Sequence, residues 1–254
     1  MTKKRKLILA LGILLIVVSG GSMLRAYLEQ KHSEDLYSQL AQEAQTEAET
    51  EAETAAAEEE TQAAYVSPIG FQRLWQINPQ VVGWLKIPDT AVDYPILHDP
   101  ESNDTYLYTD IEGNESAAGS IYLDCDNKGD FSDLHNVIYG HHMKNGTMFK
   151  DIMNFRDQAF LESHPTVMIY LPDREIELRA YACLYTTPDG IRRMTQFDSV
   201  EALREYEQQM TEGAASRVEP DQEINRLFSF VTCSYEFDDA RTILYCYQVD
   251  AGQE

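Results

Sequence analysis

An uncharged apolar stretch near the start of the chain restricts what the first part of the sequence can form. Residues 7–24 are 18 residues without a charge, and they follow directly on the basic cluster at 3–6. That length suits a transmembrane helix, whereas the apolar core of a cleaved signal peptide is usually about 7–15 residues. Small residues at 19–22 would also allow cleavage. The length favours an uncleaved anchor.

Basic residues are unevenly distributed around this stretch, and the asymmetry predicts its orientation. Four basic residues precede it and two follow it before the sequence turns acidic. The positive-inside bias then puts the N-terminus in the cytoplasm. We therefore expect a cytoplasmic tail at 1–6, a single-pass anchor in the cell membrane at 7–24, and an extracytoplasmic remainder.

The next segment is acidic and of low complexity. Residues 33–64 carry ten acidic and no basic side chains, and they consist mostly of Ala, Glu, Thr and Gln. Such a sequence has almost nothing to bury and cannot form a core. We expect a charged, partly helical linker over 25–66 that repels itself, extends, and holds the following domain away from the membrane.

The charge of the remaining chain argues against nucleic-acid binding. Residues 65–254 supply −18 of the formal net charge of −23. Proteins that bind nucleic acid usually carry a basic patch, and an acidic domain would be repelled by phosphates.

From about residue 67 the composition becomes globular, and 67–250 fits one domain. Short β-branched and aromatic runs separated by turn residues predict a mostly β fold, a largely antiparallel sandwich or barrel. The expected strands are 82–87, 92–97, 119–123, 136–140, 167–171, 176–186, 228–233 and 242–249. The expected helices are 71–77, 148–155 and 199–210, of which the last has an apolar stripe to pack on the sheet.

One of the four cysteines stands at the end of a predicted strand. Cys125, Cys183 and Cys246 are most simply core thiols, since no pair has the close spacing of a zinc site. Cys233 ends an apolar run, and Arg241 begins the next strand eight residues later. If these strands form a hairpin, the guanidinium lies near the sulfur. From spacing alone, a buried cysteine and a surface arginine remain the simpler interpretation.

A nucleophilic thiol needs a partner that moves protons, and histidine suits that task. His141 and His142 follow the strand 136–140, where Gly140 lets the backbone bend so that the next side chain projects. One of this pair is the better candidate. The other histidines are interpreted as surface or turn residues: His32, His98, His135 and His164.

Several segments resemble sortases, particularly those of class B. Tyr-Gly-His at 139–141, with the residues up to 149, is similar to the family's catalytic-histidine segment. Residues 229–233 resemble the signature Thr-Leu-x-Thr-Cys, with the final Thr-Cys retained and Ser-Phe in the first two places. Arg241 matches the family's arginine on the last strand. The resemblance covers nearly all of residues 70–249, with further agreement at 82–88, 93–95, 119–124 and 199–210.

The resemblance implies a closed sortase-like β-barrel with added helices and a cysteine transpeptidase that needs no cofactor. It implies that Cys233 attacks the scissile carbonyl as a thiolate and that His141 protonates the leaving amine. Arg241 would bind the substrate backbone or the oxyanion. Strand alternation would turn His142 to the opposite face.

The resemblance also implies a substrate class. Sortases of class B cleave a short sorting motif near the C-terminus of a secreted protein after its threonine, often of the Asn-Pro-x-Thr kind. The acyl group then passes to a peptidoglycan precursor or a pilin amine, which anchors the protein to the cell surface. Asn103, Leu107 and Thr232 correspond to positions that contact the substrate.

Two other interpretations remain open at this point. A papain-like cysteine protease would use Cys, His and Asn, but its cysteine normally lies on a helix near the start of the mature domain. A non-enzymatic surface module would present a β-barrel on a stalk to a partner. No metal site is expected, because Lys128 would oppose a cation beside Asp124, Asp126 and Asp130, which favours a solvated turn.

Overall fold

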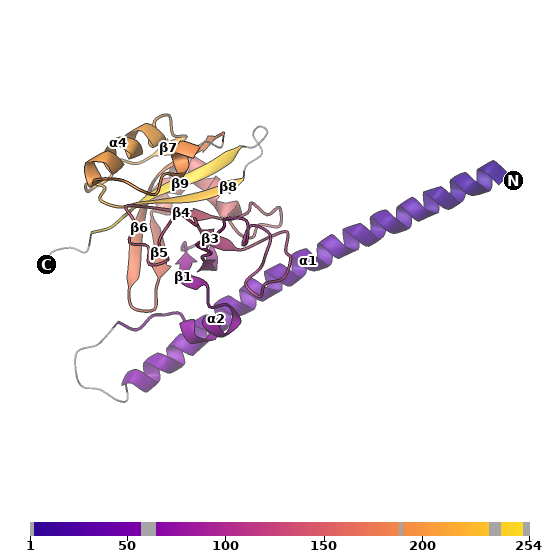
Figure 1. Ribbon diagram of the computed structural model, residues 1–254, viewed down its shortest axis with the longest axis horizontal. Coiled ribbons are helices and arrows are strands. Elements are labelled where there is room, and N and C mark those ends of the chain that lie inside the picture. Colours follow the sequence, from indigo (N-terminus) through magenta and orange to yellow (C-terminus); the bar gives the residue numbers. More distant parts are fainter. Residues whose placement is uncertain (1–2, 57–64, 188–189, 234–239, 251–254) are drawn as a thin grey trace.

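The computed structural model describes residues 3–56, 65–187, 190–233 and 240–250, and in the first range only the side chains of 4–5 and 11–46. A long helix, α1 (Lys3–Ala56), is followed by a β-rich domain with α2 (Phe71–Ile77) at its entrance (Figure 1). The strands are β1 (Val81–Lys86), β2 (Asp93–Leu97), β3 (Ile121–Leu123), β4 (His135–Tyr139), β5 (Thr166–Tyr170), β6 (Glu175–Thr186), β7 (Ser216–Arg217), β8 (Leu227–Cys233) and β9 (Arg241–Gln248). Short helices lie between them: η1 (Lys150–Arg156), α3 (Gln158–Ser163), η2 (Gly190–Arg193) and α4 (Val200–Thr211).

The strands form one sheet that closes into a barrel. Within the described ranges the order is β5-β1-β2-β3-β4-β8-β9-β6-β7, and the additional pairing of β5 with β6 closes eight strands on themselves. Strand β7 extends from β6 outside the closed ring. The pairs β2–β3 and β4–β8 are parallel, and the other pairs are antiparallel. The predicted fold class, a closed barrel with added helices, is confirmed.

Alternation along β8 separates two hydrophobic clusters. Phe228 and Phe230 belong to the large core that β1, β2 and β5 share. Leu227 and Val231 face the other way, into a second cluster that includes Leu203 of α4. Because successive strand residues point to opposite faces, the last residue of β8 shares the face of Val231. The chain between β6 and β8, which includes α4, packs on that outer face.

Helix α1 differs from the extended linker predicted for residues 25–66. Helix α1 continues without interruption through the predicted anchor into the acidic segment, and its second half lies against the domain (Figure 1). Tyr37 and Leu40 are only 4 % exposed, and Ala44 only 1 %. The expectation that 33–64 buries almost nothing is wrong for residues 33–44. Apolar side chains three and four residues apart form a buried stripe there, which the overall composition conceals.

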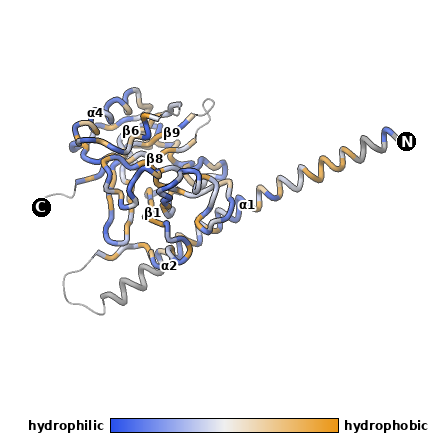
Figure 2. Tube along the Cα trace, in the orientation of Figure 1, coloured by the Kyte–Doolittle hydropathy of each residue, from blue (hydrophilic) through white to orange (hydrophobic). Residues whose placement is uncertain are grey.

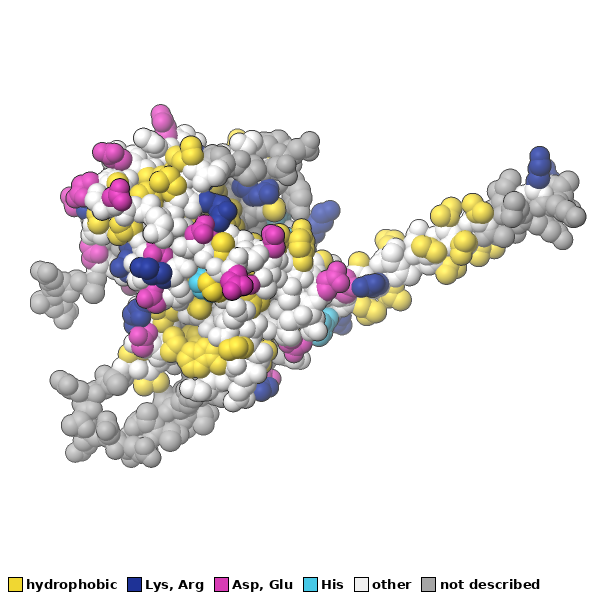
Figure 3. Space-filling model, in the orientation of Figure 1, with side chains coloured by type: hydrophobic (Ala, Val, Ile, Leu, Met, Phe, Trp, Pro, Cys, Tyr) yellow, Lys and Arg dark blue, Asp and Glu magenta, His cyan; other side chains and the backbone are white. Residues whose placement is uncertain are grey.

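The first half of α1 projects away from the domain. Figure 2 shows hydrophobic residues along this part of the backbone, and the space-filling view shows apolar side chains exposed on it (Figure 3). Among the described residues, α1 contains one segment long and apolar enough to cross a membrane.

His135 is a further correction, because it lies inside the domain rather than on its surface. Its Nε2 is 2.7 Å from the hydroxyl of Ser229, and its Nδ1 is 2.6 Å from the carbonyl of Met194. Burial lowers the pKa of His135 to about 4, so the ring is neutral at neutral pH. It joins β4, β8 and the segment before α4. His98 is also buried.

We predict that His135 makes stability depend on pH between about 6.5 and 4. In this window unfolded His135 binds a proton and folded His135 does not, so the unfolded state is favoured as the pH falls. The loss should approach about 3 kcal/mol near pH 4. Urea unfolding followed by tryptophan fluorescence should show that His135→Gln, which cannot titrate, flattens this dependence. An equal slope in both proteins would contradict the assignment.

Candidate active site

Cys233 and Arg241 face each other across the ends of two strands. Cys233 is the last residue of β8, and in the antiparallel register its partner is Arg241, the first residue of β9. Directly opposed residues in such a pair have side chains on the same face. The predicted hairpin is therefore confirmed, and both side chains are partly exposed. The intervening residues 234–239 lie outside the described part of the chain.

On the other side of β8 lies β4, which ends two residues before His141. Strand β4 runs parallel to β8 with Tyr139 opposite Val231, and the amide of Gly140 donates to the carbonyl of Val231 at 3.1 Å. Continued by two residues, this register would bring His141 beside Cys233. The sheet pairs Cys233 with Arg241 and brings the end of β4, two residues before His141, next to β8.

Gly140 allows the close packing that this turn requires. A Cβ atom at this position would collide with the side chain of Ile121 and approach the ring of Phe149 to 2.8 Å. Both neighbours are buried in the large core and cannot easily withdraw. Glycine therefore lets β4 end directly against the barrel core, and the next residue leaves the strand at the site.

The imidazole of His141 is held by a backbone carbonyl. Its Nε2 is 2.7 Å from the carbonyl oxygen of Leu107. Because a carbonyl only accepts, Nε2 carries the proton, and Nδ1 is the nitrogen that can accept another. The centroid of the His141 ring lies 5.7 Å from the centroid of the Tyr108 ring. The backbone of His141 is also held, because the amide of Phe149 donates to the carbonyl of His141 at 2.9 Å.

The residues predicted to bind substrate have different environments. Leu107 lies at the site, since its carbonyl holds His141 and its side chain packs partly on the core. Asn103 accepts a hydrogen bond at 2.8 Å from the amide of Cys125 and so holds the end of β3. Their contacts with substrate stay a prediction.

Thr232 differs from its expected role. It is 2 % exposed and shares the inward face of Phe230, whereas Cys233 faces outward. Its side chain is therefore buried under η1, beside Thr242, whose hydroxyl contacts the sulfur of Met153. Strand alternation, which the sequence resemblance does not consider, removes the Thr232 side chain from the face of the thiol.

A pocket opens on the outer face next to Arg241. Its apolar floor comes from β4, β8 and β9, and its rim carries three arginines. The lining residues are Val137, Tyr139, Thr186, Thr187, Arg192, Arg193, Val231, Arg241 and Ile243. Since Val231 and Arg241 are the neighbours of Cys233 on this face, the pocket adjoins the thiol.

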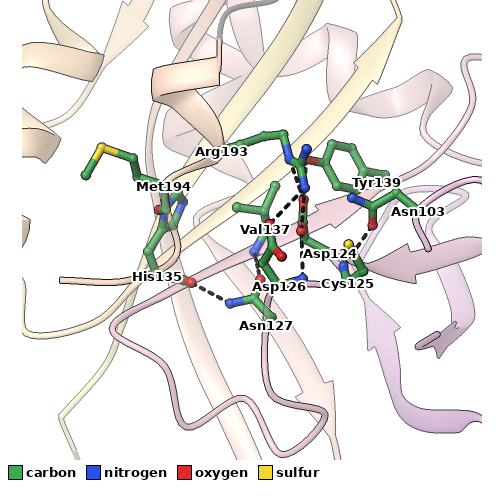
Figure 4. Close-up of polar contacts among 10 residues, drawn as sticks. All are labelled: Asn103, Asp124, Cys125, Asp126, Asn127, His135, Val137, Tyr139, Arg193 and Met194. Atoms are coloured by element: carbon green, nitrogen blue, oxygen red, sulfur yellow. Dashed lines mark hydrogen bonds and ion pairs between the residues drawn. The ribbon is translucent and has the colours of Figure 1, made fainter. Parts of the chain in front are cut away.

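An ion pair fixes one wall of the pocket, and sequence analysis does not single it out. Asp124 is fully buried and accepts from Arg193 Nε at 2.9 Å and Nη2 at 3.0 Å, and from the hydroxyl of Tyr139 at 2.7 Å (Figure 4). Burial opposes ionisation, but the bonds from Arg193, from the amide of Asp126 and from Tyr139 hold the pKa of Asp124 below its usual value. Arg193 also reaches Asp126 at 3.1 Å. A signal for Arg193 is its position in an Arg-Arg pair within an acidic domain.

This pair also corrects the expectation of a solvated turn. Ligand atoms of Asp124, Cys125 and Asp126 lie within 4.8 Å of one another, as in a metal site. The guanidinium of Arg193 lies between the two carboxylates and already supplies the positive charge.

The other thiols are poor nucleophiles. Burial raises the pKa of Cys183 to about 12 and that of Cys246 well above its ordinary value. Burial also raises the pKa of Cys125, which is partly exposed. Among the described cysteines, Cys233 alone is a partly exposed residue at a strand end with an arginine as its strand partner.

Comparison with known proteins finds similar sequences and a similar fold. The family model described as a sortase domain matches residues 85–249. The chain is 35 % identical to sortase B of Listeria monocytogenes over 167 residues, which are 65 % of this chain and 67 % of that protein. Sortase B of Staphylococcus aureus is 26 % identical over 194 residues, 76 % of this chain and 74 % of its own length. The sortase B structure from Clostridium perfringens superposes with a TM-score of 0.66 at 25 % identity, covering 71 % of this chain and 100 % of that one.

We predict that Cys233 is the cysteine that alkylating reagents modify first. A pKa near 12 leaves Cys183 a roughly thousandfold smaller thiolate fraction than an ordinary thiol, and Cys246 is equally buried. Brief treatment with iodoacetamide, followed by peptide mapping in a mass spectrometer, should label Cys233 first and Cys183 and Cys246 only after denaturation. Faster labelling of Cys125 than of Cys233 would contradict the assignment of the nucleophile.

Proposed function

The chain belongs to the sortase family and is a cysteine transpeptidase, and we propose that it cleaves a sorting motif of secreted proteins after threonine and transfers the acyl group to a cell-surface amine. The observation that carries this proposal is the register that pairs Cys233 with Arg241 and brings the end of β4, two residues before His141, next to β8. The papain-like alternative lacks support, because Cys233 ends a late strand and not an early helix. The family match also favours an enzyme over a binding module.

In the first half of the proposed reaction, the Cys233 thiolate attacks the carbonyl carbon of the scissile peptide bond. The carbonyl electrons move to the oxygen, and the guanidinium of Arg241 stabilises that negative charge with directed N–H donors. When the intermediate collapses, the C–N bond breaks, and His141 gives its proton to the departing amine. A thioester on Cys233 and a neutral His141 remain.

In the second half an acceptor amine attacks the thioester. His141 takes the proton from the attacking nitrogen, and Arg241 again stabilises the oxyanion. The C–S bond then breaks and returns the electron pair to Cys233 as a thiolate. The sum is exchange of one amide for another. The acceptor in this proposal is the amine of a peptidoglycan precursor or of a pilin.

The pocket beside the thiol suits an extended peptide that lies across the strand ends. Its floor is apolar, and the cations on its rim can bond to peptide carbonyls. In the proposal Leu107 and Asn103 border the same path. Thr232 is left out of it, because its side chain is buried on the other face.

The proposed location is the outer side of the cell membrane. The exposed apolar part of α1 would cross the bilayer once, with the basic cluster at 3–6 in the cytoplasm. The barrel would then meet secreted proteins as they emerge.

The function is tested by incubating the full chain in detergent with a library of C-terminal motif peptides and a short amine acceptor. Mass spectrometry should find a product cut after threonine and joined to the acceptor, with Cys233→Ala as the inactive control. Cys125→Ala, Cys183→Ala and Cys246→Ala should keep activity where they fold. Turnover by Cys233→Ala at the parent rate would refute the proposal.

The two histidines give a matched pair of variants. We expect His141→Ala to abolish cleavage, because the leaving amine then has no proton donor. His142→Ala should lose little, since the pairing of His142 with Met148 is a backbone bridge that the substitution leaves in place. Steady-state kinetics measure both effects. If both histidine variants fold and lose activity equally, the assignment of His141 as the one catalytic histidine is wrong.

Arg241 should not tolerate lysine. Its role needs a planar cation with several donors, and loss of one oxyanion donor typically costs a hundred- to a thousandfold in turnover, or about 3–4 kcal/mol. Arg241→Lys should therefore keep its melting temperature and its reactivity with iodoacetamide while losing most peptide cleavage. If Arg241→Lys cleaves peptide at the parent rate, Arg241 has no catalytic role and only Cys233 and His141 remain as catalytic candidates.

A further inference from the structure

We propose that Tyr37 of helix α1 is a positioning residue for His141, so that the helix leading into the barrel supports the catalytic histidine. This inference rests on the proposed role of His141. It concerns a residue about a hundred positions away in the sequence, within the segment that composition assigns to a spacer.

Tyr37 is a buried side chain with a polar group at the contact between α1 and the barrel. It is 4 % exposed, and its hydroxyl lies 3.0 Å from the carbonyl of Gly119 and 3.1 Å from the hydroxyl of Ser120. The proton of Ser120 already goes to the carbonyl of Thr109 at 2.8 Å, so Ser120 can only accept from Tyr37. The Tyr37 hydroxyl is therefore the donor to the carbonyl of Gly119 and the hydroxyl of Ser120.

Residues 119–120 in turn hold the segment that binds the imidazole. The amide of Ser120 donates to the carbonyl of Tyr106 at 3.0 Å. Gly119 has a φ of 56°, and a Cβ there would strike the carbonyl of Leu107. That carbonyl is the acceptor 2.7 Å from His141 Nε2. A shift of residues 119–120 would thus displace the acceptor that orients the ring.

A second set of contacts leads from Tyr37 to the backbone of His141. The rings of Tyr37 and Tyr94 form a T-shaped pair, with centroids 5.4 Å apart and planes at 80°. The Tyr94 hydroxyl accepts from the amide of Met148 at 2.9 Å. The next amide, that of Phe149, donates to the carbonyl of His141 at 2.9 Å. Tyr37 therefore supports both the ring acceptor and the turn that carries His141.

These contacts affect the histidine and not the other catalytic groups. Cys233 and Arg241 are held by the pairing of β8 with β4 and β9, and α1 packs against α2 and β2. Loss of the Tyr37 hydroxyl should therefore misplace the proton donor while the nucleophile and the pocket stay in place. In kinetic terms kcat falls and KM does not.

Four variants of the full chain in detergent micelles test this inference. Tyr37→Phe keeps the ring contact with Tyr94 and removes the hydroxyl, and Tyr37→Ala removes both. Tyr27→Phe is the matched control, because Tyr27 is an exposed tyrosine on the same helix. Leu40→Ala controls for helix docking, because Leu40 is buried at the same contact but is apolar.

We expect Tyr37→Phe to lower kcat by about three- to tenfold with KM within about twofold, and Tyr37→Ala to lower kcat further. Tyr27→Phe should match the parent. Leu40→Ala should lower the melting temperature yet keep the parent kcat below the transition. Parent kcat in both Tyr37 variants would overturn the inference, and so would an equal kcat loss in folded Leu40→Ala.

A measurement without substrate separates this inference from the proposed function. In chain labelled with ¹³C-histidine, the imidazole signal of His141, assigned by its loss in His141→Asn, should shift in Tyr37→Phe and stay unchanged in Tyr27→Phe. An unshifted signal in Tyr37→Phe would overturn the inference even if peptide cleavage by the parent were established. A parent chain that cleaves no peptide would refute the proposed function while the shift still supported the contact.

Discussion

The active site depends on the hydrogen-bonded register of β8 between β4 and β9. Antiparallel pairing with β9 sets Arg241 opposite Cys233, and parallel pairing with β4 sets Tyr139, two residues before His141, opposite Val231. A slip of one residue in either pair would turn the partner's side chain to the opposite face of the sheet. The buried side chains of Phe228 and Phe230 oppose such a slip, because it would expose them. The core thus maintains the alignment of the catalytic groups.

Much of the barrel and the three catalytic candidates could be predicted from the sequence. Alternating apolar runs between turn residues define strands well, and Cys233, His141 and Arg241 lie in motifs whose order along the chain is specific. The short strand β7 and helix α3 were missed. They have little pattern of their own and owe their place to tertiary contacts, such as the bond from the hydroxyl of Ser216 to the carbonyl of Phe155.

Other features could not be predicted, since their meaning depends on distant partners. His135 precedes a strand and looks like a turn residue, yet α4 and the segment at Met194 cover it. The carboxylate of Asp124 is separated from Arg193 by 69 positions, and the Arg-Arg pair that marks Arg193 does not indicate which carboxylate it binds. The burial of the Thr232 side chain could not be predicted either, because a motif gives the order of residues but not the face on which each side chain lies.

The continuity of α1 has a consequence for which proteins this enzyme can serve. The apolar stretch ends at Leu24, and the helix first bonds to the barrel through the side chain of Tyr37. At 1.5 Å per residue, the helix between these two residues is about 20 Å long. A coiled tether would let the barrel rotate and reach through a wide volume above a bilayer, whereas a helix acts as a stiff strut. With the apolar stretch in a bilayer, as proposed above, the thiol would work at one height and in one direction. Client proteins would then be selected by whether their tails emerge at that level, as well as by the sequence that they carry.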